Sequence, residues 1–303
     1  MLTNKVSVVI PTHSRPNLLR KAIESVLNQT YKPCEIIVVD DTESEETARC
    51  LSVINSDIPI RLKYNTSSGA ASSRNLGAKI ANGDFVAFLD DDDLWLPTKL
   101  ETQMYELRHT QYDAIFCQMI INYEGVNIQY STRAKNVAEP LKEICIENFI
   151  GGTISCVIRR SIFMKLGGFD ERFKAREEYD LWIRVIQSNA KIKIIEKPLT
   201  ITNRSFVRNR ISSNINNYEH GISLINEKYA RLITEILTPN ERRIRLSKQY
   251  EFLAAQAISL GLKMTSSKYY FKSFLTIPSL KSLFLSLLSI ISPLMIIKIR
   301  SKL

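Results

Sequence analysis

Cysteine, histidine and glycine are scarce in this chain, and each scarcity disfavours one class of site. The five cysteines show no Cys-X-X-Cys spacing, so we expect free thiols in a reducing compartment rather than a disulfide framework. The three histidines, His13, His109 and His220, lie far apart in the sequence, which disfavours a histidine metal site. The turn PTHSRPN after the first predicted strand has no glycine, whereas a nucleotidyltransferase typically carries a glycine-rich phosphate loop there.

The chain also lacks an apolar run long enough to span a membrane, which takes about 20 residues. In the most apolar segment, 283–299, the stretch from Leu283 to Ile297 has 15 residues and contains three serines and Pro293. The N-terminus shows no apolar core of signal-peptide length before its first turn signal. We therefore expect a cytoplasmic protein without a spanning helix.

Acidic residues are absent after Glu251, so positive charge gathers toward the C-terminus. Residues 204–303 contain 16 basic and 5 acidic side chains, whereas the first 203 residues contain 25 basic and 26 acidic ones. Lysines flank the apolar segment 283–299, which favours a helix lying in a membrane interface. We therefore expect residues 263–303 to contact an anionic membrane peripherally, at the inner face of the plasma membrane.

Two alternatives to this membrane contact stay open. The basic side chains are equally typical of a merely solvated face, and the segment 283–299 could pack as a core helix on its own domain or on a partner subunit. A nucleic-acid partner is not expected, because the basic half has no regularly interleaved aromatic residues on a sheet.

Short apolar runs alternate with helical patterns over the first two thirds of the chain. We expect buried strands at 5–10, 35–39, 61–64 and 85–89, and intervening helices that include 17–28 and 70–81. This alternation predicts an α/β fold with a mostly parallel sheet covered by helices. From about residue 204 the pattern is helical, with helices expected at 217–237, 240–260 and 266–276. The predicted organisation is a domain at 1–205 and a basic helical region at 206–303.

Carboxylates follow two of the predicted strands at the point where each strand ends. Asp40–Asp41 follow EIIVV, and Asp90–Asp93 follow FVAFL. Ligands of such sheets bind at the carboxyl ends of the strands, so these residues are expected to meet at one edge. Four adjacent carboxylates repel one another, and their burial calls for a compensating cation. We therefore predict Mn²⁺ or Mg²⁺ between Asp90 or Asp92 and a diphosphate; the alternative is a solvated acidic loop that caps the next helix.

Four motifs in order resemble those of the family 2 glycosyltransferases, which are inverting enzymes of the GT-A fold. The resemblance covers about residues 5–203 and rests on the following stretches: VSVVIPTHSRPNLLRKAIESVLNQTYKPCEIIVVDD, GAASSRNLGAKIANGDFVAFLDDDDLW, VIRRSIFMKLGGFDERF and REEYDLWIRV. It implies a nucleotide-sugar donor half at about 1–95 and an acceptor half at about 96–205.

The resemblance also implies roles for residues on the donor side. Pro11, Thr12 and Arg15 would line the nucleotide pocket. Asp41 corresponds to the carboxylate that hydrogen-bonds the base, which is usually uracil, and Arg74 to a basic residue near the donor.

In the acidic run, Asp90-Asp91-Asp92 corresponds to the DxD motif of the family. The resemblance makes Asp92 the best metal ligand, with Asp90 as a second one. It places Asp91 or Asp90 near the ribose of the donor.

The catalytic base of the family corresponds to Glu178. The family usually has a Glu-Asp pair, whereas this chain has Glu177-Glu178, and the extra methylene moves the carboxylate by about one bond length. Asp180 and Glu177 are the alternatives for the base. Taken without the resemblance, the three acids are more typical of a solvated helix start than of a catalytic site.

The resemblance implies transfer of a sugar from a nucleotide-sugar donor, a UDP-sugar, to a hydroxyl of a glycan or lipid-linked glycan in cell-surface polysaccharide synthesis. One alternative acceptor is a polyprenyl phosphate, which needs no strong base. An alternative of another class is a non-catalytic protein that binds a nucleotide sugar and shows neither hydrolysis nor transfer.

Overall fold

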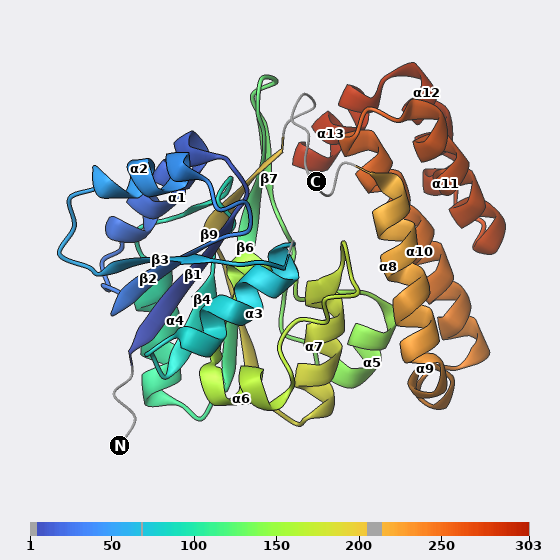
Figure 1. Cartoon of the computed structure of the whole chain (residues 1–303). Coiled ribbons are helices and arrows are strands. Elements are labelled where there is room, and N and C mark those ends of the chain that lie inside the picture. Colours follow the sequence, from blue (N-terminus) through green and yellow to red (C-terminus); the bar gives the residue numbers. More distant parts are fainter. Residues whose placement is uncertain (1–4, 68, 205–213, 303) are drawn as a thin grey trace.

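The computed structural model describes residues 5–67, 69–204 and 214–302. In this part of the chain a nine-stranded sheet is flanked by helices, and a group of C-terminal helices lies beside it (Figure 1). The predicted α/β fold with a helical C-terminal region is therefore confirmed.

The first half of the sheet is parallel, as the alternating pattern predicts. Its strands lie in the order β3-β2-β1-β4, with helices in the connections. The elements are β1 (Val6–Thr12), α1 (Pro16–Leu27), β2 (Glu35–Asp40), α2 (Glu45–Ser52), β3 (Ile60–Tyr64), α3 (Ala70–Ile80) and β4 (Phe85–Phe88). All seven residues of β1 are buried, which explains why that strand reads as a continuous apolar run.

The second half of the sheet is mixed, which refines the expectation of a mostly parallel sheet. It continues from β4 in the order β8-β6-β9-β5, and β7 pairs with β6. β8 is antiparallel to β4 and β6, whereas β6 and β9 are parallel. The elements are β5 (Leu94–Trp95), α4 (Lys99–His109), β6 (Ala114–Tyr123), β7 (Ile128–Ser131), α5 (Pro140–Ile146), β8 (Val157–Arg159), α6 (Arg160–Lys165), α7 (Glu177–Gln187) and β9 (Ile192–Arg204).

Side chains of β1 alternate between two hydrophobic cores, one on each face of the sheet. Val9 packs into the core that includes α3 and α7, whereas Val8 and Ile10 pack into the core that includes α1 and α4. At Gly77 in α3 an added Cβ would lie 2.3 Å from a methyl group of Val9, so glycine allows this helix to approach the sheet closely. The carboxyl ends of β1, β2 and β4 are thereby held at one rigid edge.

The helical region consists of six helices in the described residues, with more breaks than predicted. They are α8 (Ile215–Lys228), α9 (Ala230–Ile236), α10 (Pro239–Ser259), α11 (Lys263–Thr276), α12 (Leu280–Ile291) and α13 (Pro293–Lys302). The single helix expected at 217–237 is interrupted at Tyr229, and the segment 283–299 is split at Ser292 because Pro293 starts a new helix. A capping box of Thr238 and Glu241 starts α10.

The helical region shares its cores with the sheet. Ile121 and Tyr123 of β6 pack with Leu253 of α10 and Tyr270 of α11 in a third hydrophobic core. α8 and α9 contribute to the core that also contains α7. Across the described ranges, none of the helices combines the length and the apolar character that a membrane crossing needs.

Candidate active site

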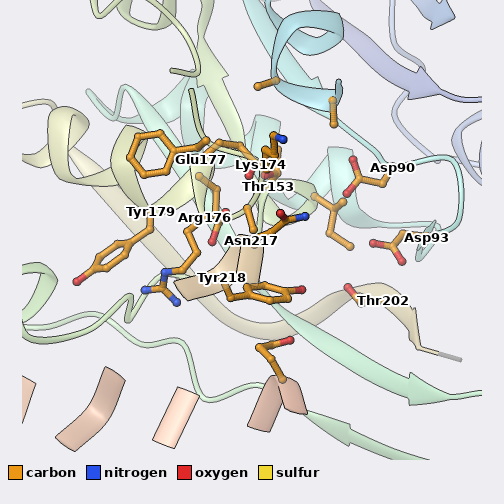
Figure 2. A pocket seen from close by; sticks show the side chains of 18 of the residues that line it. Asp90, Asp93, Thr153, Lys174, Arg176, Glu177, Tyr179, Thr202, Asn217 and Tyr218 are labelled. Atoms are coloured by element: carbon orange, nitrogen blue, oxygen red, sulfur yellow. The ribbon is translucent and has the colours of Figure 1, made fainter. Parts of the chain in front are cut away.

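A cavity of about 1160 Å³ lies at the carboxyl edge of the parallel strands and extends to the helical region. Figure 2 shows Asp90 and Asp93 on one side of it, and Arg176 and Tyr179 on the other. The predicted site residues that line it are Pro11, Thr12, Arg15, Asp41, Arg74, Asp90, Asp92, Glu177 and Glu178. Residues that are far apart in sequence thus meet in one cavity.

Two predicted site residues, Asp91 and Asp180, are buried and do not line the cavity. Asp91 is anchored behind the wall, where its Oδ2 accepts a hydrogen bond of 2.7 Å from Thr12 Oγ1 and one of 3.1 Å from Arg15 Nε. Burial raises the pKa of Asp91 to about 6, although Arg15 and Thr12 act in the opposite direction. Asp91 therefore ties the acidic loop to the end of β1.

Arginine side chains offset the charge of the acidic loop. Arg15 pairs with Asp91 and lies 3.3 Å from Asp92 Oδ2, and the buried Arg74 pairs with Asp90. We expected the repulsion among these carboxylates to call for a bound cation, but the structure places two guanidinium groups against them. The repulsion among the carboxylates of Asp90–Asp93 is therefore not sufficient evidence for a bound metal.

The loop nevertheless offers suitable ligands to a divalent metal. Asp90 and Asp92 both line the cavity, and carboxylate oxygens are the ligands that Mg²⁺ and Mn²⁺ prefer. In the portion of the chain that the structure describes, no three His, Cys, Asp or Glu side chains form a group that could hold a metal. A metal at Asp90 and Asp92 would thus need further ligands from the phosphates of a substrate, as is usual for Mg²⁺.

Asp41 lines the cavity in a fixed orientation. Its Oδ2 accepts a hydrogen bond of 2.8 Å from the backbone N–H of Gly69, and its Oδ1 lies 2.6 Å from Nδ1 of the exposed His13. Gly69 has φ +114°, a conformation that side chains rarely tolerate, so this glycine is needed where the chain turns back to Asp41.

The acids at the start of α7 have different environments. Glu177 accepts a hydrogen bond of 2.9 Å from Arg74. Glu178 is half-buried, its Oε1 lies 3.4 Å from Asn148 Nδ2, and burial together with the neighbouring charge of Glu177 raises its pKa to about 7. Glu178 therefore faces the cavity with a carboxyl group that can exchange a proton near neutral pH.

Asp180 points into the protein instead. It accepts hydrogen bonds from Arg184 and a hydrogen bond of 2.8 Å from Tyr229 Oη, and Lys228 Nζ lies 2.7 Å away. On a helix, residues two positions apart point roughly 200° away from each other. Asp180 therefore joins α7 to α8 and α9 and has no access to the cavity.

Several cavity residues come from helices that carry no recognisable motif. Tyr218 of α8 and Lys248, Gln249 and Phe252 of α10 line the cavity, as does Arg176 before α7. The residues of α8 and α10 were not predicted because residues 206–303 were described only as a basic helical region, and the one role considered there was membrane contact of residues 263–303. Arg176 directly precedes Glu177 and Glu178, and this position next to the predicted base is the one sequence feature that indicated a role for it.

Comparison with known proteins agrees with this geometry. Residues 7–167 match the family model described as "Glycosyl transferase family 2". A Haemophilus influenzae protein described as an "Uncharacterized glycosyltransferase" is 28% identical over 303 residues, which cover 97% of this chain and 98% of that protein. An Escherichia coli protein described as a "UDP-Glc:alpha-D-GlcNAc-diphosphoundecaprenol beta-1,3-glucosyltransferase" is 34% identical over 188 residues, which cover 61% of this chain and 70% of that protein.

Solved structures show the same fold at low sequence identity. TarS of S. aureus in complex with UDP-GlcNAc superposes with a TM-score of 0.57 at 16% identity, over 95% of this chain and 91% of that one. A mannosyltransferase of Pyrobaculum calidifontis in complex with GDP-Man and Mn²⁺ gives a TM-score of 0.56 at 18% identity, over 98% of this chain and 84% of that one. The match to the family model spans more than half of the chain, and the fold agrees with these enzymes, so the chain belongs to glycosyltransferase family 2.

Proposed function

We propose that this chain transfers a sugar from a UDP-sugar to a hydroxyl group of a lipid-linked glycan, with inversion at the anomeric carbon, in the synthesis of a bacterial surface polysaccharide. The observation that carries the proposal is that Asp41, the carboxylates of Asp90 and Asp92, and Glu178 all line one cavity. The E. coli relative is described as using UDP-glucose and an acceptor linked to diphosphoundecaprenol, which supports the same substrate classes here.

The donor nucleotide would bind at the carboxyl edge of the parallel strands. Asp41 would accept hydrogen bonds from the base, and Pro11 and Thr12 would line the pocket beneath it. Asp41 is held by Gly69 and His13, so its orientation does not depend on the ligand. Such preorganised groups favour binding because little conformational entropy is lost when the ligand binds.

Asp92 and Asp90 would hold Mn²⁺ or Mg²⁺ together with the donor diphosphate. When bound, the metal would supply positive charge to the departing nucleoside diphosphate. Both carboxylates line the cavity, which fits this role, and the Pyrobaculum enzyme is described in complex with Mn²⁺.

Glu178 would act as the catalytic base. A base works best when its pKa lies near the working pH, and the pKa of Glu178 is raised to about 7. Removal of the proton from the acceptor hydroxyl lets its oxygen attack the anomeric carbon opposite the leaving diphosphate. One displacement inverts the configuration, by the geometric logic known from single-displacement glycosidases.

The acceptor side of the protein offers a surface suited to a lipid. α12 exposes a stripe of apolar side chains at helical spacing, formed by Leu280, Phe284, Leu287 and Ile291. Its buried face carries serines, and Ser286 and Ser289 lie 3.1 Å from Ser267 and Ser266 of α11. A helix that buries serines and exposes leucines has the reverse of the polarity expected in water.

Exposed basic side chains occur on α12 and on the helices before and after it. Lys263, Lys268, Lys281 and Lys298 are exposed, and no acidic residue follows Glu251. Apolar side chains enter a membrane interface, whereas lysines attract anionic headgroups. We therefore assign peripheral contact with an anionic membrane to residues 263–303, which would keep the enzyme beside a lipid-linked acceptor.

The test of the proposed function is a panel of nucleotide sugars with Mn²⁺ or Mg²⁺ and a diphosphate-linked acceptor, scored for nucleoside diphosphate release and for glycan product. We expect one UDP-sugar to be used, product formation to depend on the acceptor, and EDTA to reduce the rate. If every donor is bound but neither hydrolysed nor transferred, the chain is a binding protein and the proposal fails.

A further inference from the structure

Arg176 has an unusual environment for an arginine. It precedes α7 in the left-handed conformation, with φ 70°, and it is only 8% exposed. Its guanidinium carbon lies over two aromatic rings, 4.5 Å from the centroid of Tyr179 and 4.0 Å from that of Phe252 in α10. These two cation–π contacts restrict the position of the guanidinium group.

The charge of Arg176 has no partner in hydrogen-bond contact. Among residues 5–67, 69–204 and 214–302 it makes neither an ion pair nor a side-chain hydrogen bond, and its Nε is buried without an acceptor. Arg74, which lines the same cavity, is by contrast bound by Asp90 and Glu177. Buried charged groups are normally paired, so a guanidinium left open toward a cavity indicates a ligand of negative charge.

A second guanidinium adds to the positive charge at this place. Arg245 of α10 is buried close enough to act on Arg176, and it donates hydrogen bonds to Cys145 O, Tyr179 Oη and Asn226 Oδ1. Within the described residues it makes no ion pair with a carboxylate. The carboxylate that acts most strongly on Arg176 is Glu178, the proposed base.

The position in the cavity separates this arginine from the donor side. Figure 2 shows Arg176 and Tyr179 opposite Asp90 and Asp93, with Asn217 and Tyr218 between them. Asp41 and the acidic loop account for a nucleotide diphosphate at the strand ends, so an anion at Arg176 belongs to the other substrate. The neighbouring wall is formed by α8 and α10 of the helical region.

We propose that Arg176 binds the diphosphate group through which the acceptor is joined to its lipid. This assignment rests on the proposed function, since it needs an acceptor that carries phosphate. The planar fork of a guanidinium matches two phosphate oxygens, and its restricted position means that little conformational freedom is lost on binding. Arg176 would set the distance between the diphosphate and the hydroxyl that Glu178 deprotonates.

The probe for this site is farnesyl diphosphate, titrated by calorimetry into the full chain with Mg²⁺ and saturating UDP. We expect binding that UDP does not displace. Arg176→Gln should weaken it at least tenfold, and Arg176→Lys less, because lysine keeps the charge and loses the fork. Arg108→Gln is the matched control, since Arg108 also lies over a ring, that of Tyr31, and does not line the cavity. The affinity of the control should stay within twofold of the unmodified chain.

Each variant is first checked for folding by its melting temperature and its affinity for UDP. Phe252→Leu provides a second variant if Arg176→Gln does not fold; it removes one ring face and should weaken farnesyl diphosphate several-fold. Equal affinity for the unmodified chain and the folded Arg176 variants overturns the assignment, and so does displacement of farnesyl diphosphate by UDP. If the unmodified chain binds farnesyl diphosphate through Arg176 but transfers no sugar, the proposed function fails while the assignment of a diphosphate site at Arg176 stands.

Discussion

Arg74 of α3 donates a hydrogen bond of 2.9 Å to Glu177 at the start of α7, although 103 positions separate them in the sequence. The same guanidinium pairs with Asp90 of the acidic loop. Although burial acts to lower the pKa of Arg74, the carboxylates of Asp90 and Glu177 raise it above its usual value, so the side chain stays charged. Arg74 thus connects Asp90, after β4, to the start of α7, which carries Glu178.

Replacement of Arg74 is expected to destabilise the fold. Arg74→Met removes one partner from a buried network and leaves Asp90 and Glu177 without their cation, which typically costs about 3–5 kcal/mol. The measurement is the free energy of unfolding in urea. Arg159→Met, which breaks the half-exposed pair with Asp113, is the control and should cost about 1 kcal/mol or less. Equal stability of the two variants would contradict the bridging role of Arg74.

Loss of the carboxylate at Glu178 is expected to slow the chemical step. Glu178→Gln keeps the size of the side chain and removes the base, so kcat should fall about 10²–10⁴-fold. The dissociation constant for UDP, measured by calorimetry, should not change, because the proposed function assigns binding of the nucleotide to Asp41 and not to Glu178. An unchanged kcat would instead favour a phosphate acceptor, which needs no base.

The pH dependence of the rate should follow the same group. A base is active when it is deprotonated, and the pKa of Glu178 is raised to about 7. We therefore expect kcat/KM to rise with pH through about 7 and to level off above it. A raised carboxyl pKa favours the protonated native state, so this group's contribution to stability is present below the unfolded pKa and is lost as pH rises through about 7. Both trends should be absent in Glu178→Gln, and a rate that is flat between pH 5 and 8 would argue against this base.

Asp180 is expected to matter for stability rather than for chemistry. Asp180→Asn leaves Lys228 and Arg184 without their buried carboxylate, and we expect a loss of about 3–5 kcal/mol in unfolding free energy. The concentration of folded protein is measured as the concentration of UDP-binding sites. The kcat per folded molecule should stay within a few-fold of the value for the unmodified chain. A hundredfold loss of kcat with unchanged stability would transfer the base role to Asp180.

The exposed stripe of α12 should govern membrane binding. Phe284→Ser combined with Leu287→Ser removes two apolar side chains, each worth about 1.5–3 kcal/mol when fully buried, so partition into vesicles with anionic lipid should fall at least tenfold. Co-sedimentation with vesicles measures this, and Val53→Ser, at another exposed apolar residue, is the control. Unchanged sedimentation would exclude the stripe as a membrane contact. Loss of a dimer in light scattering would show that it binds a second copy instead.

Substitution in α12 is a better test than truncation of the C-terminus. Leu288 of α12 and Ile296 and Ile297 of α13 belong to the third hydrophobic core, which also contains Tyr123 of the sheet. Deletion of residues 279–303 would therefore open that core and confuse loss of folding with loss of lipid contact.

Much of the fold and part of the cavity could be predicted from local patterns. The strands before Asp40 and Asp90 are continuous apolar runs, and strands that alternate with helices have to end at a common edge, which brought Asp41 and Asp92 into one cavity. The break at Tyr229 was not predicted, and neither was the one at Ser292, although Pro293 marks it in the sequence. The antiparallel β8 was missed because three residues are too few for a period to show.

By itself the sequence determined the alternating strands and helices of the parallel half of the sheet and that acids stand at two of the strand ends, because spacing and side-chain type express these locally. Only the tertiary structure decided that Arg15 and Arg74 offset the charge of Asp90–Asp92, that Glu178 lines the cavity while Asp180 is buried behind it, and that Arg176 contacts rings from two regions of the chain. The physical reason is that a charge is set by the groups around it, and here those groups come from positions far away in the sequence.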